Sequence, residues 1–164
     1  MDRLSKIDYY LSIAHTISLR GTCLRRNFGA IIVNNDEIVS TGYVGAPRGR
    51  RNCIDIGECR RQKLAIPAGQ RYELCRSVHA EANAIISASR KDMIGGTLYL
   101  VGTDANTGNH VSGIDCCSMC KRQIINSGIT SVVMRDPDSD KGYVEHQVRD
   151  WVFNDESIGE HEGY

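Results

Sequence analysis

The sequence predicts an α/β protein in which helices cover a sheet in three layers. From Ser77 onward, segments with a helical spacing of apolar residues alternate with short β-branched runs, a pattern typical of this fold class. The chain has 164 residues, 41% of them hydrophobic, which suffices for a core of its own. We see no internal repeat and no sign of a second domain, so we expect one domain over residues 1–164.

The first elements follow from local patterns. Residues 4–20 place apolar side chains near a spacing of 3.6, which predicts an amphipathic helix that packs on the core. The runs 29–33 and 38–43 flank turn-forming residues and indicate a β-hairpin. Residues from about 44 to 76 are rich in Gly, Arg and Cys and predict an irregular loop, with at most a short helix near 58–65. Loops of this length are commonly functional or held by a metal.

The second half of the chain alternates helix and strand and then becomes acidic. The predicted elements are a helix capped by Ser77 that ends near Arg90, a strand at 97–101, a polar loop at 102–115, a helix at about 118–127 and a strand at 129–134. After these comes an acidic C-terminal tail at about 136–164.

The charge balance argues against a protein that coats nucleic acid. The chain has 20 Lys and Arg against 20 Asp and Glu, whereas proteins that bind DNA or RNA through bulk attraction carry a basic excess. The balance hides a split, because residues 1–76 hold 13 basic and 7 acidic side chains and residues 77–164 hold 7 and 13. No stretch approaches the roughly 18 apolar residues of a membrane helix, and the N-terminus lacks the apolar centre of a signal peptide. We therefore expect a soluble, cytoplasmic protein.

Two short motifs carry chemistry. Cytosolic thiols stay reduced, so the seven Cys favour metal binding or catalysis over disulfides. Cys117 and Cys120, spaced C-x-x-C at a helix start, can share a metal with His79, and three protein ligands leave a fourth tetrahedral position open, as in catalytic zinc sites. Glu81, two residues after His79, can exchange protons with water in that position. H-x-E followed by C-x-x-C is the known signature of zinc deaminases.

Simpler interpretations exist for each motif alone. A C-x-x-C pair can be redox-active or half of a structural zinc site, and a histidine near a helix start is usually packed or solvated. Glu81 discriminates between these interpretations, because a structural zinc site has no use for it.

The chain resembles the deoxycytidylate deaminase branch of the cytidine deaminase-like superfamily from about Cys23 to Arg135. The segments that carry the resemblance are Cys23-Leu-Arg-Arg, Gly29-Ala-Ile-Ile-Val33, Thr41-Gly-Tyr-Val-Gly-Ala-Pro-Arg-Gly49, His79-Ala-Glu-Ala-Asn-Ala-Ile85, and Cys117-Ser-Met-Cys120 with Ile124-Ile-Asn-Ser-Gly-Ile129. The zinc motif identifies the superfamily, and the G-Y-x-G-x-P-x-G loop with the H-A-E-x-N-A-I form indicates this branch.

The resemblance implies a specific fold and activity. The fold is a cytidine deaminase-like α/β/α sandwich around a five-stranded mixed sheet. Zinc lies on His79, Cys117 and Cys120, Glu81 shuttles protons, and the backbone of Ala80 contacts the pyrimidine of dCMP, which is hydrolysed to dUMP. Such enzymes are often homohexamers, activated by dCTP and inhibited by dTTP with Mg²⁺.

Two positions depart from the family pattern. The family loop usually reads G-Y-N-G, and Val44 here replaces an amide that looks like a substrate contact in related deaminases, so it lacks both the donor and the acceptor. Cys116 stands where Pro usually precedes the C-x-x-C pair. We interpret Cys116 as a buried thiol outside the metal site, because free Cys is commonly buried.

A second zinc site is predicted upstream. Cys23, Cys53, Cys59 and Cys75 flank or lie within the irregular loop, and four thiolates match a closed structural zinc site. Some family members carry a structural zinc in this region. The alternative is four separate buried thiols.

A basic cluster in the same loop predicts phosphate binding. Its cationic members are Arg48, Arg50, Arg51, Arg60, Arg61 and Lys63. Arginine forks suit phosphate oxygens, and nearby glycines such as Gly45 let the backbone approach them. The alternative is a solvated loop whose charges pair with its own acids. Tyr43 and Tyr72 can stack on a base or simply pack.

Together these observations predict a zinc hydrolase that releases ammonia from a cytosine nucleotide. The alternatives are a nucleic-acid-binding or DNA-uptake accessory protein on a deaminase scaffold, and a deaminase of another nucleotide or of RNA. The zero net charge and the 6% aromatic content disfavour the nucleic-acid alternatives. In a homo-oligomer, the acidic tail of one chain is predicted to face the basic loop of another.

Overall fold

The structure is a computed structural model that describes residues 2–154. Its centre is a five-stranded sheet in the order β2-β1-β3-β4-β5. The strands are β1 (Arg26–Asn34), β2 (Glu37–Tyr43), β3 (Thr97–Asp104), β4 (Ser131–Arg135) and β5 (Tyr143–Gln147). Only β3 and β4 pair in parallel, so the sheet is mixed, which confirms the predicted fold class.

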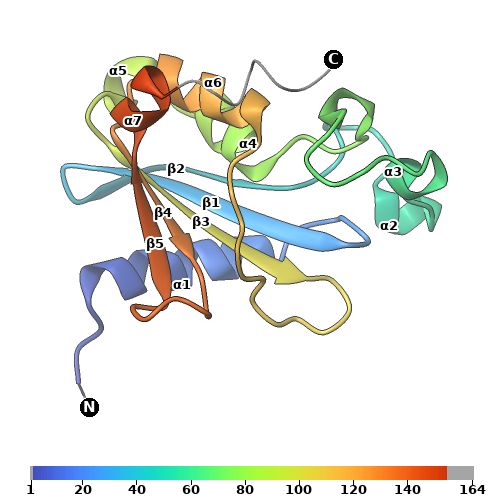
Figure 1. Cartoon of the computed structure of the whole chain (residues 1–164), viewed down its shortest axis with the longest axis horizontal. Helices are drawn as coiled ribbons and strands as arrows, with labels where there is room; N and C mark the ends of the chain where they lie inside the picture. Colours follow the sequence, from blue (N-terminus) through green and yellow to red (C-terminus); the bar gives the residue numbers. More distant parts are fainter. Residues whose placement is uncertain (1, 155–164) are drawn as a thin grey trace.

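Helices cover both faces of this sheet (Figure 1). On one face lies α1 (Lys6–Ser18). The other face is covered by α4 (Ala80–Ile86), α5 (Arg90–Met93), α6 (Ser118–Ser127) and α7 (Val148–Phe153). The short helices α2 (Cys53–Ile56) and α3 (Arg60–Lys63) and the 3₁₀ turn η1 (Tyr72–Leu74) belong to the segment between β2 and α4. In the described part of the chain, no helix is long and apolar enough to cross a membrane.

Alternation along β1 builds both halves of the core. Successive strand side chains point to opposite faces, so Ile31 and Val33 pack with α1 while Ala30 and Ile32 pack with α4 and α6. All four are buried. The sheet therefore fixes the helices on its two faces in one rigid frame.

The structure confirms the predicted helix at 4–20, the hairpin and the helix at about 118–127. The predicted start of the helix after Ser77 is wrong. That helix begins at Ala80 with His79 at its N-cap, not at Ser77, and it ends at Ile86, before a separate α5. Val78 is held extended by two backbone hydrogen bonds with Gly45, of 2.8 and 3.2 Å. This non-local pairing prevents the helix from starting earlier and places His79 at its first turn.

Three further boundaries differ from the sequence prediction. β3 continues to Asp104 because it pairs with β1 along its whole length. The irregular loop contains α2 in addition to the short helix expected near residues 58–65. Residues 143–153, predicted as part of an acidic tail, form β5 and α7, because β5 completes the sheet along β4 and Val148 is buried. The last part of that tail, residues 155–164, lies outside the described residues.

Glycine lets α4 approach the sheet closely. A Cβ placed on Gly42 of β2 would lie 2.3 Å from the carbonyl oxygen of Ala80 and 2.4 Å from the nitrogen of Ala84. Both atoms are backbone, so a side chain cannot be accommodated by a rotamer change. Gly42 thereby sets the depth at which the first turn of α4 packs.

Replacing Gly42 with Ala is expected to push α4 outward. Overpacking of this kind costs about 1–3 kcal/mol, so the free energy of unfolding in urea should fall by that amount. Thr41→Ala, at the exposed neighbouring position of β2, is the matched control and should change it by less than about 0.5 kcal/mol. Equal stability of the Gly42→Ala variant and the wild type would contradict this account of the packing.

Candidate functional site

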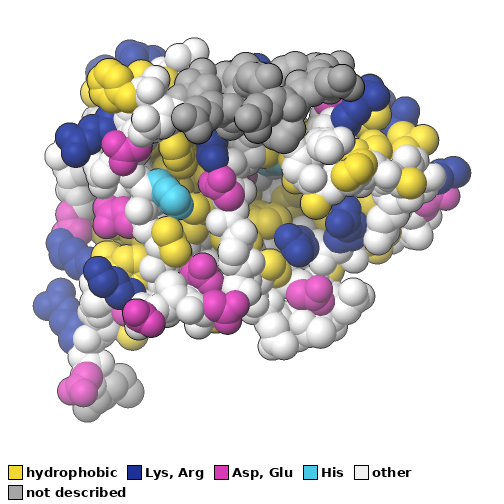
Figure 2. Space-filling view, in the orientation of Figure 1, with side chains coloured by type: hydrophobic (Ala, Val, Ile, Leu, Met, Phe, Trp, Pro, Cys, Tyr) yellow, Lys and Arg dark blue, Asp and Glu magenta, His cyan; other side chains and the backbone are white. Residues whose placement is uncertain are grey.

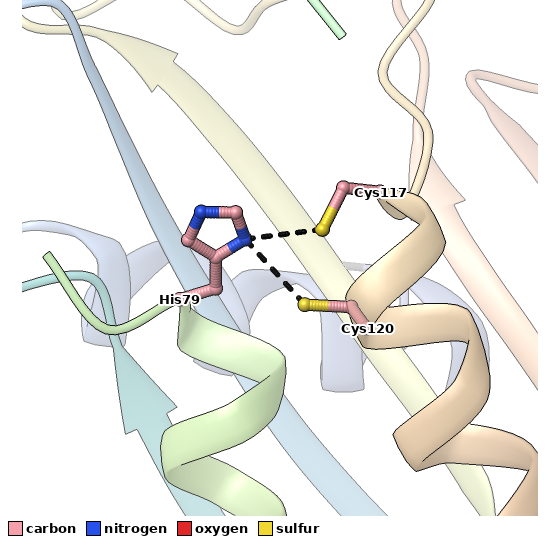
Figure 3. Close-up of side chains that lie close together, drawn as sticks. All are labelled: His79, Cys117 and Cys120. Carbon is pink, nitrogen blue, oxygen red and sulfur yellow. Dashed lines mark hydrogen bonds between the residues drawn. The ribbon is translucent and has the colours of Figure 1, made fainter. Parts of the chain in front are cut away.

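The candidate site forms where the N-termini of α4 and α6 meet. His79 is the N-cap of α4 and Cys117 is the N-cap of α6, each with an extended backbone conformation. Cys120 lies one turn into α6 and is buried. The side chains of all three residues point toward one another from the two helices (Figure 3).

The donor atoms of these residues form a compact set. The Nδ1 atom of His79 lies 3.4 Å from the sulfur of Cys117 and 3.5 Å from the sulfur of Cys120. All three donors lie within 4.8 Å of one another, and no other group of three His, Cys, Asp or Glu within residues 2–154 does so. One imidazole nitrogen and two thiolates fit zinc, and three protein ligands leave a fourth position open.

The electrostatics of the site favour a thiolate. A hydrogen bond from the Cys120 thiol, together with the influence of His79, outweighs burial and lowers the pKa of Cys117 to about 4. Burial alone would lower the pKa of His79, but its hydrogen bonds to sulfur and the nearby Glu81 raise it to about 11. Because metal ligands must be deprotonated, a zinc ion would displace the proton shared by these groups.

Glu81 lies in the same first turn of α4 and is almost completely buried, with 5% of its surface exposed. Burial raises the pKa of its carboxyl group, although the neighbouring His79 acts in the opposite direction. A carboxyl group in this position can take up a proton and release it to a substrate. The position of Glu81 next to the metal ligands suits proton transfer.

Cys116 is buried at 2% exposure, as predicted, and lies outside the compact donor set. Its backbone N–H donates to the Asp115 carboxylate at 2.8 Å, a bond that proline could not make. Its thiol hydrogen-bonds to Glu81, and burial raises its pKa. Cys116 therefore contacts the candidate proton carrier and not the metal centre.

A cavity of about 440 Å³ opens beside His79 and Cys117, two of the three residues of the candidate metal centre (His79, Cys117 and Cys120). This volume is in the range of small-molecule sites. Besides His79, Glu81 and Cys117, it is lined by apolar or aromatic side chains and by four cations: Phe28, Val44, Tyr72, Ile114, Arg25, Arg26, Arg61 and Lys121. Lys and Arg side chains also border a hollowed region on the face seen in Figure 2.

The predicted substrate contacts divide into two groups. Val44 and Ala80 line the cavity and are buried, and Gly45 is held against Val78 just before His79. Tyr43, Arg48, Arg50 and Arg51 are exposed and are not among the cavity residues. The structure thus brings the first group to the site and leaves the second on the surface.

Three of the four upstream cysteines line the cavity wall: Cys23, Cys59 and Cys75. Cys53 is buried beside them, and the other three thiols act electrostatically to raise its pKa, after burial as the main cause. In the described part of the chain, their sulfurs do not form a compact donor set comparable with that of His79, Cys117 and Cys120.

Several cavity residues were not predicted from the sequence. Lys121 could have been found, because it follows Cys117 by four residues and so shares its face of α6. It pairs with Asp115 at 2.6 Å. Phe28 and Ile114 carry no comparable signal, since only the pairing of β1 with β3 and the path of the loop before α6 bring them to the cavity.

The chain matches one described family over most of its length. The pattern of the cytidine and deoxycytidylate deaminase zinc-binding region matches residues 4–135. This range includes every residue of the compact donor set and Glu81.

Individual relatives agree with this match. The deoxycytidylate deaminase of Mycobacterium phage D29 is 36% identical over 81% of this chain and 96% of that protein. ComE operon protein 2 of Bacillus subtilis is 33% identical over 80% of this chain and 60% of that protein. Some relatives are much longer, and the chain spans 35% of the deoxycytidylate deaminase of Schizosaccharomyces pombe.

The fold also resembles a solved structure. The dCMP deaminase of cyanophage S-TIM5, solved in complex with dCMP and dUMP, has a TM-score of 0.56 at 22% identity, covering 82% of this chain and 85% of that one. At this identity the likeness concerns the fold alone.

Replacing Cys120 with Ser is expected to remove one zinc ion per chain, because the site loses one of its two thiolate ligands. Zinc content by inductively coupled plasma mass spectrometry measures the change. Cys116→Ala is the matched control, since Cys116 is equally buried but outside the donor set, and it should retain the zinc of the wild type. Unchanged zinc in Cys120→Ser would exclude Cys120 as a ligand.

Proposed function

This chain belongs to the deoxycytidylate deaminase family within the cytidine and deoxycytidylate deaminase zinc-binding superfamily, and on that premise we propose that it hydrolyses dCMP to dUMP and ammonia. The observation that carries the proposal is the compact set of His79, Cys117 and Cys120, at a cavity that His79, Cys117 and the buried residue Glu81 line together. A structural zinc site would not need that carboxyl group.

In this proposal each residue has a defined task. When bound by His79, Cys117 and Cys120, zinc supplies activation of a water molecule as the nucleophile. Glu81 would accept one proton of the attacking water as its oxygen bonds to C4 of cytosine, and would pass that proton to the ring nitrogen N3. It would then take the proton of the new C4 hydroxyl group and give it to the exocyclic nitrogen, so that the C4–N bond breaks, ammonia leaves and C4 becomes a carbonyl group. The backbone of Ala80 and the apolar wall at Val44 hold the pyrimidine.

The charges of the cavity support an anionic substrate. Arg25, Arg26, Arg61 and Lys121 line it, against the acids Glu81 and Asp115. This excess of positive charge suits a nucleotide better than a nucleoside. The relative from Mycobacterium phage D29, 36% identical to this chain, is named a deoxycytidylate deaminase, which supports the same substrate class.

Other features of the proposal concern metals, effectors and assembly. We propose that Cys23, Cys53, Cys59 and Cys75 bind a second, structural zinc, and the electrostatic influence of the other three thiols on Cys53 supports it. A homohexamer activated by dCTP and inhibited by dTTP with Mg²⁺ follows from the family resemblance. Analytical ultracentrifugation with and without these effectors tests the assembly, and a monomer in all conditions would contradict it.

The second candidate function is a nucleic-acid-binding or DNA-uptake accessory protein on a deaminase scaffold, and one relative, ComE operon protein 2, does not carry the name of a deaminase. In such a protein catalysis would be dispensable. The presence of Glu81 in the same cavity as His79 and Cys117 favours the enzyme.

The proposed function is tested by ammonia release from dCMP, dCTP, deoxycytidine, CMP, 5-methyl-dCMP and guanine. We expect the highest kcat/KM with dCMP. Glu81→Ala should lower kcat by about 10²–10⁴-fold, because it removes the proton carrier, and should leave the zinc content unchanged. Failure of the zinc-loaded protein to deaminate any cytosine nucleotide would refute the proposal. Wild-type activity in the Glu81→Ala variant would show that Glu81 is not the proton carrier of the reaction.

If the four cysteines bind a second zinc ion, the purified protein should contain two zinc ions per chain. The double variant Cys53→Ser, Cys59→Ser should then hold one, and it should unfold at a lower temperature, since structural zinc contributes folding free energy. One zinc ion per chain in both the wild type and the double variant would exclude the four-cysteine site and would not affect the proposed catalytic site.

A further inference from the structure

Arg61 of α3 is a buried cation at the cavity. Only 4% of the residue is exposed, and it lines the cavity together with His79 and Glu81. Its Nη1 atom donates to the carbonyl oxygen of Arg71 and its Nη2 atom to that of Pro67, each at 2.8 Å. Within residues 2–154, no carboxylate lies within ion-pair distance of its guanidinium.

A buried charge of this kind needs compensation that the chain only partly supplies. The two carbonyl groups use two of the five N–H donors of a guanidinium. The ring of Tyr72 lies 4.4 Å from the Cζ atom of Arg61 and adds a cation–π contact. Neutral partners stabilise a buried cation less than a paired anion does, and the nearby Glu73 acts on Arg61 without forming an ion pair with it, since its carboxylate pairs with Arg71. Arg61 is thus arranged to receive an anion from the cavity.

The other cations of the cavity are less suited to this role. Lys121 is already paired with Asp115 at 2.6 Å. Arg26 is exposed and Arg25 half-exposed, so water screens their charges. Arg61 also offers a planar fork, which matches two oxygens of a phosphate group.

Tyr72 links Arg61 to the metal centre. The Tyr72 ring packs edge-on against the His79 ring, with centroids 5.1 Å apart at 85°. The guanidinium therefore lies within one nucleotide's length of the reacting end of the cavity, on the same wall as a metal ligand. A substrate whose base reaches Glu81 can place its phosphate at the other end of this wall.

From this arrangement we propose that Arg61 binds the 5′-phosphate of the substrate and is the residue that makes the enzyme prefer a nucleoside monophosphate to a nucleoside. This inference rests on the proposed function and assigns its substrate preference to one residue. The inference also assigns a role to the segment 53–76. Arg61 binds to the carbonyl oxygens of Pro67 and Arg71, and these hydrogen bonds hold the guanidinium group at the cavity.

The test compares kcat/KM for dCMP and for deoxycytidine in the zinc-loaded wild type, Arg61→Gln, Arg61→Lys and Arg60→Gln. Arg60 is adjacent, exposed and outside the cavity, so its variant should match the wild type. Arg61→Gln should lower the ratio of kcat/KM for dCMP to kcat/KM for deoxycytidine by about 10- to 100-fold, because it removes hydrogen bonds from a charged donor to the phosphate. Arg61→Lys keeps the charge without the fork and should give an intermediate ratio.

The outcomes separate this inference from the proposed function. A wild type that deaminates neither compound refutes the function itself. A wild type that prefers dCMP, with the ratio unchanged in both Arg61 variants, overturns only the role of Arg61. An equal loss with both substrates in Arg61→Gln also overturns it, because that result shows a structural role alone. If Arg61→Gln does not fold, the ratio in Arg61→Lys decides.

Discussion

The meeting of two helix N-termini at His79, Cys117 and Cys120 is the constraint on which the site depends. The histidine lies 38 residues before the first of the two cysteines, and the three converge because α4 and α6 pack side by side on one face of the sheet. Gly42 lets α4 pack deeply, and the bonds between Gly45 and Val78 fix where that helix starts. The chemistry of the ligands thus depends on the backbone geometry of β2.

The same wall of the cavity joins the metal centre to the segment 53–76. Arg61, Tyr72 and His79 follow one another across it, so the irregular segment contributes directly to the site. The zero net charge of the chain hides this arrangement. Within the described residues, the basic N-terminal half supplies three of the four cations of the cavity, whereas the second half supplies the compact donor set and Glu81.

Secondary-structure elements could be predicted where the residues that define their ends are neighbours in the sequence. The bounds of α6 agree with the sequence prediction because its signals are local: the C-x-x-C pair begins at its N-cap, Cys117, and Gly128 is its C-cap. The metal ligands were predictable because their spacing is a property of the motif. By contrast, the start of α4 depends on pairing with Gly45, and β5 needs β4 beside it to become a strand. Arg48 and Arg61 belong to one basic run. The buried Arg61 differs from the exposed Arg48 through its contacts with the carbonyls of Pro67 and Arg71 and with the ring of Tyr72, which no local pattern reveals.

The most direct test of the central claim is anomalous scattering at the zinc edge from crystals of the zinc-loaded protein. The account predicts a zinc ion bound by the Nδ1 atom of His79 and the sulfurs of Cys117 and Cys120, with its fourth position facing Glu81 and free of protein ligands. A fourth bond from the sulfur of Cys75 or Cys116 would contradict it, because a closed site could not perform the proposed hydrolysis.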